Sequence, residues 1–440
     1  MKTFLKKFIP APILSWYHKA LPLLANIIYG HPSEKLIVIG VTGTNGKSTT
    51  VNLIAAILEE AGYKVGLTST VNFKIDKKEW LNDKKMTMLG RFALQKLLKQ
   101  MVVADCDYAI IETSSEGIKQ SRHLGINYDL AIFTNLTPEH LESHGNFDNY
   151  KNAKGELFKK LKRDKTKKLG GKKIEKISIV NLDDEHASYF LQFPADRKFG
   201  YGVNFISDIT GVEEIRAEGI SLSKDSAIFK VGDANFNLSL LGRFNVYNAL
   251  VAVCVGLSQK IETDKIAIGL ARVKGVAGRM EFIDEGQDFK VLVDYAPEPE
   301  SMKQLYQTID DLKLAQGRII HLLGSAGGGR DKSRRSVLGE LAGSRAQFVV
   351  VTNEDPYDED PQEIIDQVAG GAMKAGKSLD QELFKILDRR EAINKVLSLA
   401  GAGDLVLITG KGSEQAICLE RGRKVKWDDR QVVKEELAKI

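Results

Sequence analysis

Short apolar runs alternate along this chain with longer stretches in which apolar residues recur every three or four positions. Runs of the first kind predict buried strands, and stretches of the second kind predict amphipathic helices. The expected strands are residues 36–39, 108–112, 130–134, 177–181, 291–294, 319–323, 348–352 and 405–409, and the expected helices are residues 50–62, 91–103, 149–161, 301–313, 361–374 and 389–400. This alternation is typical of helices that cover both faces of a sheet, so we predict an α/β fold with doubly wound, mostly parallel sheets.

One region, residues 205–240, follows a different pattern. Apolar and polar residues alternate there between Gly and Asp turns, which predicts antiparallel hairpins inserted in the α/β framework. The glycine-flanked residues 275–278 are the best candidate for a hinge. We therefore expect a helical segment or linker over residues 1–35, a central nucleotide-binding α/β domain over 36–278 and a second, Rossmann-like α/β domain over 279–440.

The composition is that of an ordinary soluble protein: of 440 residues, 43% are hydrophobic and 28% are charged, and the net charge is +5. Such a small charge does not indicate nucleic-acid binding, and the lysine-rich residues 159–176 are expected to form a solvated loop or a frayed helix end. Cys106, Cys254 and Cys418 are odd in number and far apart, which predicts neither a disulfide framework nor a zinc site. These cysteines suit a reducing compartment, so we expect a cytoplasmic protein.

Residues 2–29 begin with several lysines and continue with a series of apolar residues. His18 and Lys19 interrupt that series, and no clear small-residue cleavage site follows, so neither a bilayer span nor a signal peptide is predicted. Two interpretations are open. The segment is either a helix docked on the protein or a helix that makes weak contact with a membrane surface.

The most informative segment is the turn between the first expected strand and the first expected helix. It contains Gly43, Thr44, Asn45, Gly46, Lys47, Ser48 and Thr49. A strand, a glycine-punctuated turn and a helix N-terminus gather backbone N–H groups around one point, which suits a polyphosphate. Lys47 would neutralise charge on the outer phosphates, and the Ser48 hydroxyl would bind a magnesium ion. A chance Gly-Lys-Ser in an ordinary turn is the alternative, but the strand–turn–helix context favours a nucleoside triphosphate site.

Further polar motifs follow the next expected strands, where ligands of parallel sheets bind. Together with the phosphate loop, these motifs resemble the Mur ligase family of ATP-dependent amide-bond-forming enzymes, and most closely its UDP-N-acetylmuramoyl-tripeptide synthetase branch, which adds the third amino acid to the peptidoglycan precursor. The resemblance extends from about residue 23 to residue 419. The matching segments are residues 39–50, 112–115, 135–141, 150–154, 241–249, 278–281, 293–296, 388–393 and 410–412.

The resemblance implies four catalytic residues, namely Lys47, Glu112, His140 and Lys154. Ser48, Glu112 and His140 would bind magnesium ions, and Lys154 would become a ligand after carbamylation by carbon dioxide, because a carbamate offers oxygen atoms whereas an ammonium cannot bind a metal. Each residue has a plainer alternative: Glu112 as a capping or surface acid, His140 as a structural histidine and Lys154 as a solvent-facing helix lysine.

The resemblance also assigns residues to ATP. Asn245 and Asn248 would lie near the adenine, Arg279 at the phosphates or ribose, and Asp294 at the ribose. The two asparagines could instead cap or pair within a helical bend. Because Arg279 follows the expected hinge, ATP binding would pull the last domain over the central one and exclude water from a hydrolysable acyl phosphate.

The substrate residues implied by the resemblance are Thr87, Ser114 and Arg122 for the muropeptide precursor, and Glu354, Asp355, Tyr357, Gly410 and Glu414 for the incoming amino acid. Branches of the family that accept meso-diaminopimelate carry arginine where this chain has Tyr357, so the sequence argues against that acceptor. Lysine or ornithine would suit the acidic residues at 354–360, unless these form only a solvated turn.

This chain departs from the family pattern at several positions. Pro297, Ser413 and Glu116 replace histidines, and Thr87-Met88-Leu89 stands where the family has two threonines and a proline. Only residues 1–35 precede the first expected strand, whereas these synthetases normally carry an N-terminal domain that holds the uridine diphosphate. We therefore expect this function to be missing or to be supplied by a partner.

We predict an ATP-dependent ligase that joins an amino acid to the carboxylate of a muropeptide resembling UDP-MurNAc-L-Ala-D-Glu through an acyl phosphate. A ligase resembling folylpolyglutamate synthase, or one that amidates a lipid-linked precursor, is the first alternative. A non-catalytic ATP-binding partner subunit is the second, and the presence of all four catalytic residues argues against it. Assays of phosphate release across a panel of acceptors would separate these hypotheses.

Overall fold

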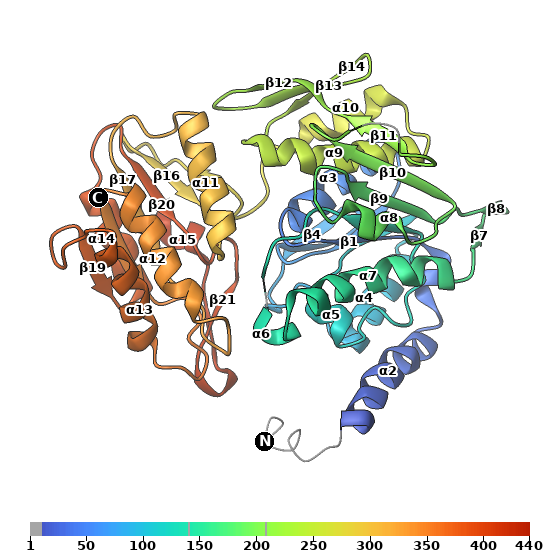
Figure 1. The fold of residues 1–440 in the computed structure, drawn as a ribbon, viewed down its shortest axis with the longest axis horizontal. Helices are drawn as coiled ribbons and strands as arrows, with labels where there is room; N and C mark the ends of the chain where they lie inside the picture. The colour runs from blue at the N-terminus through green and yellow to red at the C-terminus, as the bar shows by residue number, and fades with distance from the viewer. Residues whose placement is uncertain (1–10, 140, 207–208) are drawn as a thin grey trace.

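The structure is a computed structural model that describes residues 11–139, 141–206 and 209–440. Two α/β units lie side by side, each built on its own sheet (Figure 1). We call the nine-stranded sheet with its helices the central domain, and the six-stranded sheet with its helices the C-terminal domain. The doubly wound α/β class predicted from the sequence is confirmed.

The central sheet is parallel except for its last two strands, β3 and β4, which form an antiparallel meander with β2. Strand β1 lies in the middle, between β6 and β5, so the turn that follows it is flanked by two further strand ends. In spatial order the strands are β11 (Glu213–Arg216), β10 (Arg197–Gly202), β9 (Ile177–Asn181), β6 (Leu130–Phe133), β1 (Ile37–Thr42), β5 (Tyr108–Glu112), β2 (Val65–Thr68), β3 (Asn72–Ile75) and β4 (Lys78–Leu81).

Helices cover both faces of this sheet. The first face carries α3 (Lys47–Glu60), α9 (Arg243–Ser258) and α10 (Thr263–Arg272). The second face carries α4 (Arg91–Val103), α5 (Ser115–Lys119), α7 (Phe147–Arg163) and α8 (Ala187–Leu191). The remaining helices of this unit are α2 (Ala11–Ile28), which packs on α4, the 3-10 helix η1 (Pro32–Lys35) and the short α6 (Leu141–His144).

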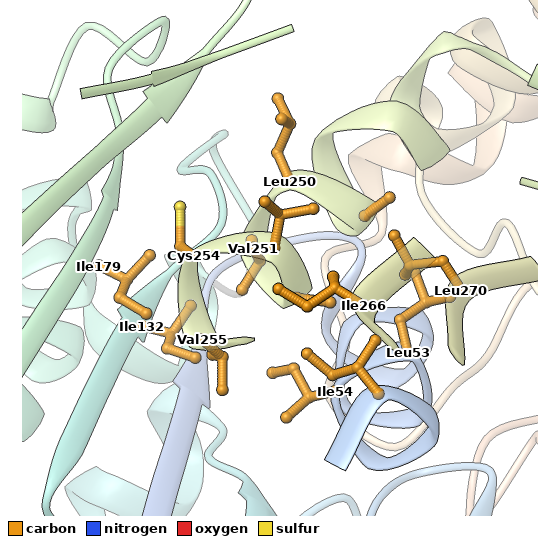
Figure 2. Close-up of a cluster of buried hydrophobic side chains, with 14 of the residues drawn as sticks. Leu53, Ile54, Ile132, Ile179, Leu250, Val251, Cys254, Val255, Ile266 and Leu270 are labelled. Atoms are coloured by element: carbon orange, nitrogen blue, oxygen red, sulfur yellow. The ribbon is translucent and has the colours of Figure 1, made fainter. Parts of the chain in front are cut away.

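The core of the first face forms because α9 is apolar on almost all sides and lies between the sheet and its neighbouring helices. Figure 2 shows Val251, Cys254 and Val255 of α9 between sheet residues such as Ile132 and residues of α3 and α10 such as Ile54. Every side chain in this cluster is nearly or fully buried. This packing fixes α3, and with it the turn that precedes α3.

The region expected to form antiparallel hairpins divides into two parts. Strands β12 (Glu218–Leu222), β13 (Ala227–Val231) and β14 (Ala234–Leu238) form the expected antiparallel sheet. The prediction is wrong for β11, which pairs parallel with β10 at the edge of the central sheet. Its short length and its Glu-rich sequence hid it, because neither feature is typical of a parallel strand.

The lysine-rich residues 159–176 also differ from the expectation. They complete α7 and form a small hairpin of β7 (Lys168–Leu169) and β8 (Lys172–Lys173). Lys167 and Lys176 are buried and both form ion pairs with Asp129, which is fully buried. The interpretation of this run as wholly solvated is therefore wrong for these two lysines.

The six-stranded sheet of the C-terminal domain has helices on both faces, and only its edge strand β15 is antiparallel. Its strands, in spatial order, are β15 (Glu281–Ile283), β16 (Lys290–Val293), β20 (Leu405–Ile408), β17 (Ile319–Leu323), β18 (Phe348–Thr352) and β19 (Leu383–Ile386). Helices α11 (Pro299–Asp311), α12 (Ser333–Arg345) and α13 (Pro361–Lys374) lie on one face, and α14 (Arg389–Leu399) and α15 (Asp429–Leu437) lie on the other. A hairpin of β21 (Ala416–Cys418) and β22 (Lys424–Lys426) around the 3-10 turn η2 (Glu420–Gly422) completes the unit.

The expected hinge joins the two units, and Gly278 within it is strongly constrained. Its φ angle is 63°, and a Cβ atom there would lie 2.1 Å from the backbone nitrogen of Ser413. Only glycine fits so close to the loop after β20. The connection between the domains is therefore packed against the C-terminal domain rather than free.

Candidate active site

The turn between β1 and α3 has the conformation of a phosphate-binding loop. Gly43 and Gly46 have φ angles of 150° and 82°. A Cβ atom at Gly43 would lie 1.9 Å from Thr134 Oγ1, so the loop can lie against the end of β6 only with glycine at this position. The strand, loop and helix expected from the sequence are present, which argues against a chance Gly-Lys-Ser in an ordinary turn.

The end of β6 holds this loop in place. The backbone N–H of Asn45 donates to Asn135 Oδ1 at 2.8 Å, and Thr44 N–H donates to the Asn135 carbonyl at 2.8 Å. Thr134 Oγ1 donates to the Asn45 carbonyl at 2.8 Å. Asn135, one of the residues that carried the family resemblance, therefore shapes the loop itself.

Ser48, in the first turn of α3, meets Glu112 at the end of β5. Ser48 Oγ donates to Glu112 Oε2 at 2.9 Å. Thr70 adds two further bonds to the carboxylate, from its backbone N–H at 2.7 Å and from Oγ1 at 3.0 Å. Glu112 is 2% exposed, so it is not a surface acid. A hydroxyl beside a carboxylate is a hard oxygen donor pair that suits magnesium.

Lys154 is 2% exposed, which excludes the alternative of a solvent-facing lysine. Its Nζ donates to the Gly43 carbonyl at 2.7 Å and lies 4.3 Å from the centre of the Tyr150 ring. Lys47 Nζ donates to the same carbonyl at 3.0 Å. Burial lowers the pKa of Lys154 well below its usual value, the charge of Lys47 lowers it further, and Glu139 acts in the opposite direction. The ammonium form is therefore less favoured here than in an exposed lysine.

His140 lies outside the described residues, so the structure gives no geometry for it. Among residues 11–139, 141–206 and 209–440, no group of three or more His, Cys, Asp or Glu side chains could hold a metal ion. Glu139, directly before His140, lines the same cavity as Lys154.

Asn245 and Asn248 lie in the first turns of α9, under the phosphate loop. Asn248 Nδ2 donates to Asn245 Oδ1 at 2.9 Å, and Asn248 Oδ1 accepts from Thr50 Oγ1 at 3.2 Å. Asn245 Nδ2 also donates to the carbonyl of Leu241 at 2.7 Å. The two asparagines thus pair within the helix, which was the alternative to adenine binding in the sequence analysis, and they also line the cavity.

Arg279 and Asp294 lie at the entrance to the C-terminal domain. The Arg279 guanidinium stacks over the Tyr295 ring at 4.4 Å. Asp294 Oδ2 accepts from the Met280 backbone N–H at 2.7 Å. Burial raises the pKa of Asp294, and Arg279 acts against this effect. Both residues line the cavity shared with the phosphate loop.

Four charged side chains, three of them buried and the fourth, Glu414, half-buried, form a cluster at the C-terminal side of the cavity. Lys411 Nζ donates to Asp355 Oδ1 and to Glu414 Oε2, both at 2.8 Å. Lys85, from the central domain, donates to Asp355 Oδ2 at 2.6 Å and also to Glu414. Two lysines therefore neutralise Asp355 and Glu414, two of the three carboxylates that the resemblance assigns to the amino acid.

The solvated-turn alternative for residues 354–360 is wrong for Glu354 and Asp355, which are both 5% exposed, and describes only Asp358 and Asp360. The pKa of Glu354 is raised to about 7, first by burial and then by the nearby charge of Asp355, while the charge of Lys411 acts in the opposite direction. Gly410 packs behind this side chain, since a Cβ atom there would lie 2.6 Å from Glu354 Oε2.

The residues expected to contact the muropeptide lie on the central domain. Thr87 Oγ1 is hydrogen-bonded to Thr70 Oγ1 at 2.9 Å, which links it to the Glu112 carboxylate. Ser114 caps α5 by accepting from the Gly117 backbone N–H at 3.1 Å. Arg122 donates to the carbonyl of Met88, and this hydrogen bond anchors the loop that carries Thr87.

Sequence reasoning missed four residues of this site, namely Thr70, Lys85, Glu298 and Ser301. Ser301 Oγ donates to Asn45 Oδ1 at 3.1 Å, so α11 contacts the phosphate loop directly. Burial raises the pKa of Glu298 to about 8, although its ion pair with Arg334 acts in the opposite direction. Thr70 follows β2, and Glu298 follows β16. The rule that ligands bind at the ends of parallel strands would have indicated Thr70 if β2 had been predicted. It would have indicated Glu298 if the family's histidine had stood in place of Pro297.

One cavity of about 570 Å³ between the two domains collects these side chains. Among the described site residues predicted from the sequence, Gly410 alone does not line it. The predicted residues that do are Gly43, Thr44, Asn45, Gly46, Lys47, Ser48, Thr49, Thr87, Glu112, Ser114, Arg122, Lys154, Asn245, Asn248, Arg279, Asp294, Glu354, Asp355, Tyr357 and Glu414.

Comparison with known proteins gives two family matches in chain order. Residues 41–256 match the Mur ligase middle domain, and residues 278–412 match the Mur ligase glutamate ligase domain. The first match ends at residue 256 within α9, the second begins at Gly278 of the hinge, and each one covers most of one structural domain.

Curated relatives match over nearly the whole chain. A UDP-N-acetylmuramyl-tripeptide synthetase of Roseiflexus sp. (strain RS-1) is 38% identical over 429 residues, which are 96% of this chain and 82% of that protein. A UDP-N-acetylmuramoyl-L-alanyl-D-glutamate--2,6-diaminopimelate ligase of Syntrophomonas wolfei is 38% identical over 422 residues, 95% of this chain and 81% of that protein.

Solved structures share the fold. A UDP-N-acetylmuramoyl-L-alanyl-D-glutamate--2,6-diaminopimelate ligase aligns with a TM-score of 0.57 and 27% identity over 92% of this chain and 79% of that chain. Mycobacterium tuberculosis folylpolyglutamate synthase, complexed with ADP and AMPPCP, aligns with a TM-score of 0.68 over 88% of this chain and 92% of that chain. At 16% identity, this second likeness concerns the fold alone.

Proposed function

This chain belongs to the Mur ligase family, and we propose that it is an ATP-dependent ligase that joins an amino acid to a muropeptide carboxylate in peptidoglycan precursor synthesis. One observation carries the proposal: a single cavity is lined by a phosphate loop from one domain and by a cluster of buried acids and lysines from the other. ATP and an amino acid can thus meet a third substrate between them.

The reaction follows from the groups around the loop. The loop N–H groups and Lys47 would hold the triphosphate of ATP, and an oxygen of the muropeptide carboxylate would attack the γ-phosphorus, with ADP as the leaving group. The amine of the acceptor would then attack the acyl carbon, lose a proton and expel inorganic phosphate. The net change is one amide bond formed and one ATP converted to ADP and phosphate.

Magnesium fits the donor chemistry of Ser48 Oγ and the Glu112 carboxylate, which are both hard oxygen ligands. When bound, the ion would neutralise charge on the outer phosphates. Thr70 holds the carboxylate in position by two hydrogen bonds. In this proposal His140 assists at a second ion.

We further propose that Lys154 is carbamylated. Burial lowers the pKa of Lys154, and in its neutral form the amine can attack carbon dioxide and lose a proton, which leaves an N-carboxylate on this side chain. The product would bring negative oxygen atoms beside Lys47 and the magnesium site. Burial of an ammonium at the same position would be costly, because among the described residues Nζ donates to the Gly43 carbonyl and not to a carboxylate.

Closure of the two domains would protect the acyl phosphate from water. Ser301 contacts the phosphate loop, and Lys85 reaches from the central domain into the acid cluster. Arg279, directly after the packed hinge, faces the same cavity. These contacts support a closed arrangement in which ATP and the amino acid sit on opposite sides of the carboxylate.

For the acceptor, we propose an amino acid that Glu354, Asp355, Tyr357, Gly410 and Glu414 recognise. Tyr357 offers a hydroxyl where the diaminopimelate-specific branch has a guanidinium, but Arg330 lines the same cavity. The acceptor panel should therefore contain lysine, ornithine and meso-diaminopimelate.

The test is phosphate release by the purified protein with ATP and magnesium. We expect release that requires both a UDP-muramoyl-dipeptide and an amino acid. Turnover with a folate and glutamate instead would favour a folylpolyglutamate synthase-like activity, and no release with any acceptor would favour a non-catalytic ATP-binding subunit. The substrates and cysteines of this chain suit a cytoplasmic enzyme, and among the described residues no helix combines the length and apolar character needed to cross a membrane.

A further inference from the structure

Helix α2 has two faces of different kinds. Its docked face packs on α4 and contains the buried residues Pro22 and Ala25. Its opposite face, which we call the free face, is apolar yet 48% to 70% exposed. The free face consists of Trp16, Leu23, Leu24, Ile27 and Ile28. Intervals of three and four residues place these side chains on one stripe of the helix.

Docking of α2 on the protein therefore explains its docked face but leaves its free face without a partner among the described residues. Large exposed apolar side chains elsewhere in the described structure, such as Ile268 and Val103, belong to other helices. A continuous apolar stripe on a helix that already has a docked face marks a surface that binds something else.

The charge of the N-terminal segment indicates what kind of partner the free face binds. All 58 acidic residues of the chain lie beyond Ser33, whereas Lys2, Lys6, Lys7 and Lys19 lie before it. The segment that contains the free face thus carries positive charge without any carboxylate to balance it. An apolar stripe within an acid-free, lysine-bearing segment complements a lipid surface with anionic headgroups.

Aromatic side chains support this assignment. Trp16 and Tyr17 are 70% and 49% exposed at adjacent positions of α2. Both rings have an apolar body and a polar tip, which suits the headgroup level of a bilayer. No helix of the described residues could cross a membrane, so α2 would lie on the surface rather than span it.

We propose that α2 docks this protein on the surface of a bilayer rich in anionic lipid, with its free face at the boundary between headgroups and acyl chains. A second copy of the chain suits the face less well, because a symmetric contact would bring two lysine-bearing, acid-free segments together. In Figure 1, α2 projects from the lower edge of the central domain and its N-terminal end points away from that domain, so the helix is available to a flat surface.

The experiment is flotation of the full-length protein with vesicles. We expect binding to vesicles of phosphatidylglycerol and phosphatidylcholine in equal parts, much weaker binding to phosphatidylcholine alone, and loss of binding at high salt. Leu24→Glu combined with Ile27→Glu should lower the partition coefficient at least about tenfold, because two charges would enter the apolar boundary. Lys6→Gln combined with Lys7→Gln should weaken binding to the anionic vesicles only.

The control is Ile268→Glu, which introduces one glutamate at a position on α10 that is as exposed as Leu24, 48%. It should bind vesicles as the wild type does. Equal binding by the Leu24/Ile27 variant would overturn the proposal, as would absence of binding to both kinds of vesicle. A dimer in sedimentation analysis that the same double variant disperses would instead assign the face to a second copy. These readouts need no catalysis, so they stand apart from the test of the ligase.

Discussion

Lys85 Nζ lies 2.6 Å from Asp355 Oδ2, and this ion pair joins the two domains across the active-site cavity. The two side chains are only 5% and 6% exposed. Lys85 belongs to the loop that carries Thr87, and Asp355 follows β18 in the C-terminal domain. The muropeptide side of the cavity is therefore tied to the amino-acid side by a buried charge contact.

Replacing Lys85 with methionine should impair the ligase. Among the described residues, the buried carboxylate of Asp355 and the half-buried carboxylate of Glu414 would keep Lys411 as their one cationic partner, and an uncompensated buried charge costs about 3 kcal/mol or more. We expect kcat/KM for the amino acid to fall at least about tenfold, measured by coupled ADP release. Lys84→Met is the matched control, because Lys84 is exposed and pairs only with its neighbour Asp83. Equal kinetics of the two variants would show that the contact has no role.

Glu112→Gln should raise the magnesium requirement. The substitution keeps the side chain's shape but removes the negative charge beside Ser48, so the half-saturating magnesium concentration should increase about tenfold or more. The measurement is phosphate release as a function of magnesium. Asp107→Asn, at the other end of the same strand, should leave the curve unchanged. An unchanged curve for Glu112→Gln would place magnesium elsewhere.

Lys154→Arg should abolish carbamate formation, since a guanidinium stays protonated and does not react with carbon dioxide. With ¹³C-labelled bicarbonate, the wild-type protein should show a carbamate carbon resonance that this variant lacks. Activity should fall on the order of a hundredfold. Lys151→Arg, on the same helix, should keep both the resonance and the activity. A wild-type spectrum without the resonance would refute the carbamate.

The buried carboxyl of Glu354 makes stability depend on pH. Its folded pKa of about 7 lies above the ordinary value of 4.5, so between these values the native state binds more protons than the unfolded state. The free energy of unfolding contributed by this group is therefore fully present below pH 4.5 and is lost as the pH rises through 7.

Glu354→Gln cannot titrate and should escape this loss. Relative to the wild type, the variant should gain on the order of 3 kcal/mol in free energy of unfolding between about pH 4.5 and about pH 8. Urea denaturation at several pH values measures the difference, with Glu363→Gln on the exposed side of α13 as the control. A pH-independent difference would mean that Glu354 titrates normally in the folded protein.

The sequence predicted the parallel framework well because the strands concerned are buried on both faces. β5, β9, β17 and β18 begin and end where the apolar runs do, since a two-sided core demands continuous apolar residues. The pattern failed at β11 and the β2–β4 meander, where strands are short or half exposed. Local composition does not reveal such strands, because β-propensity depends on the packing around each strand.

The candidate site divides in the same way. Residues in contiguous motifs, such as Lys47, Glu112 and Lys154, could be placed because each motif fixes its own local geometry. Lys85 and Ser301 could not, since their contacts form only when two domains meet, and no local pattern records a contact across a cavity. The pairing of Asp355 and Glu414 with lysines was hidden for the same reason.

Oxygen transfer tests the central claim most directly. The protein would be incubated with ATP, magnesium, an amino acid and a UDP-muramoyl-dipeptide whose reacting carboxylate carries ¹⁸O. An acyl phosphate between the carboxylate and the γ-phosphate predicts that one labelled oxygen appears in the released phosphate. Phosphate released without the label, or at the same rate without the muropeptide, would contradict the account.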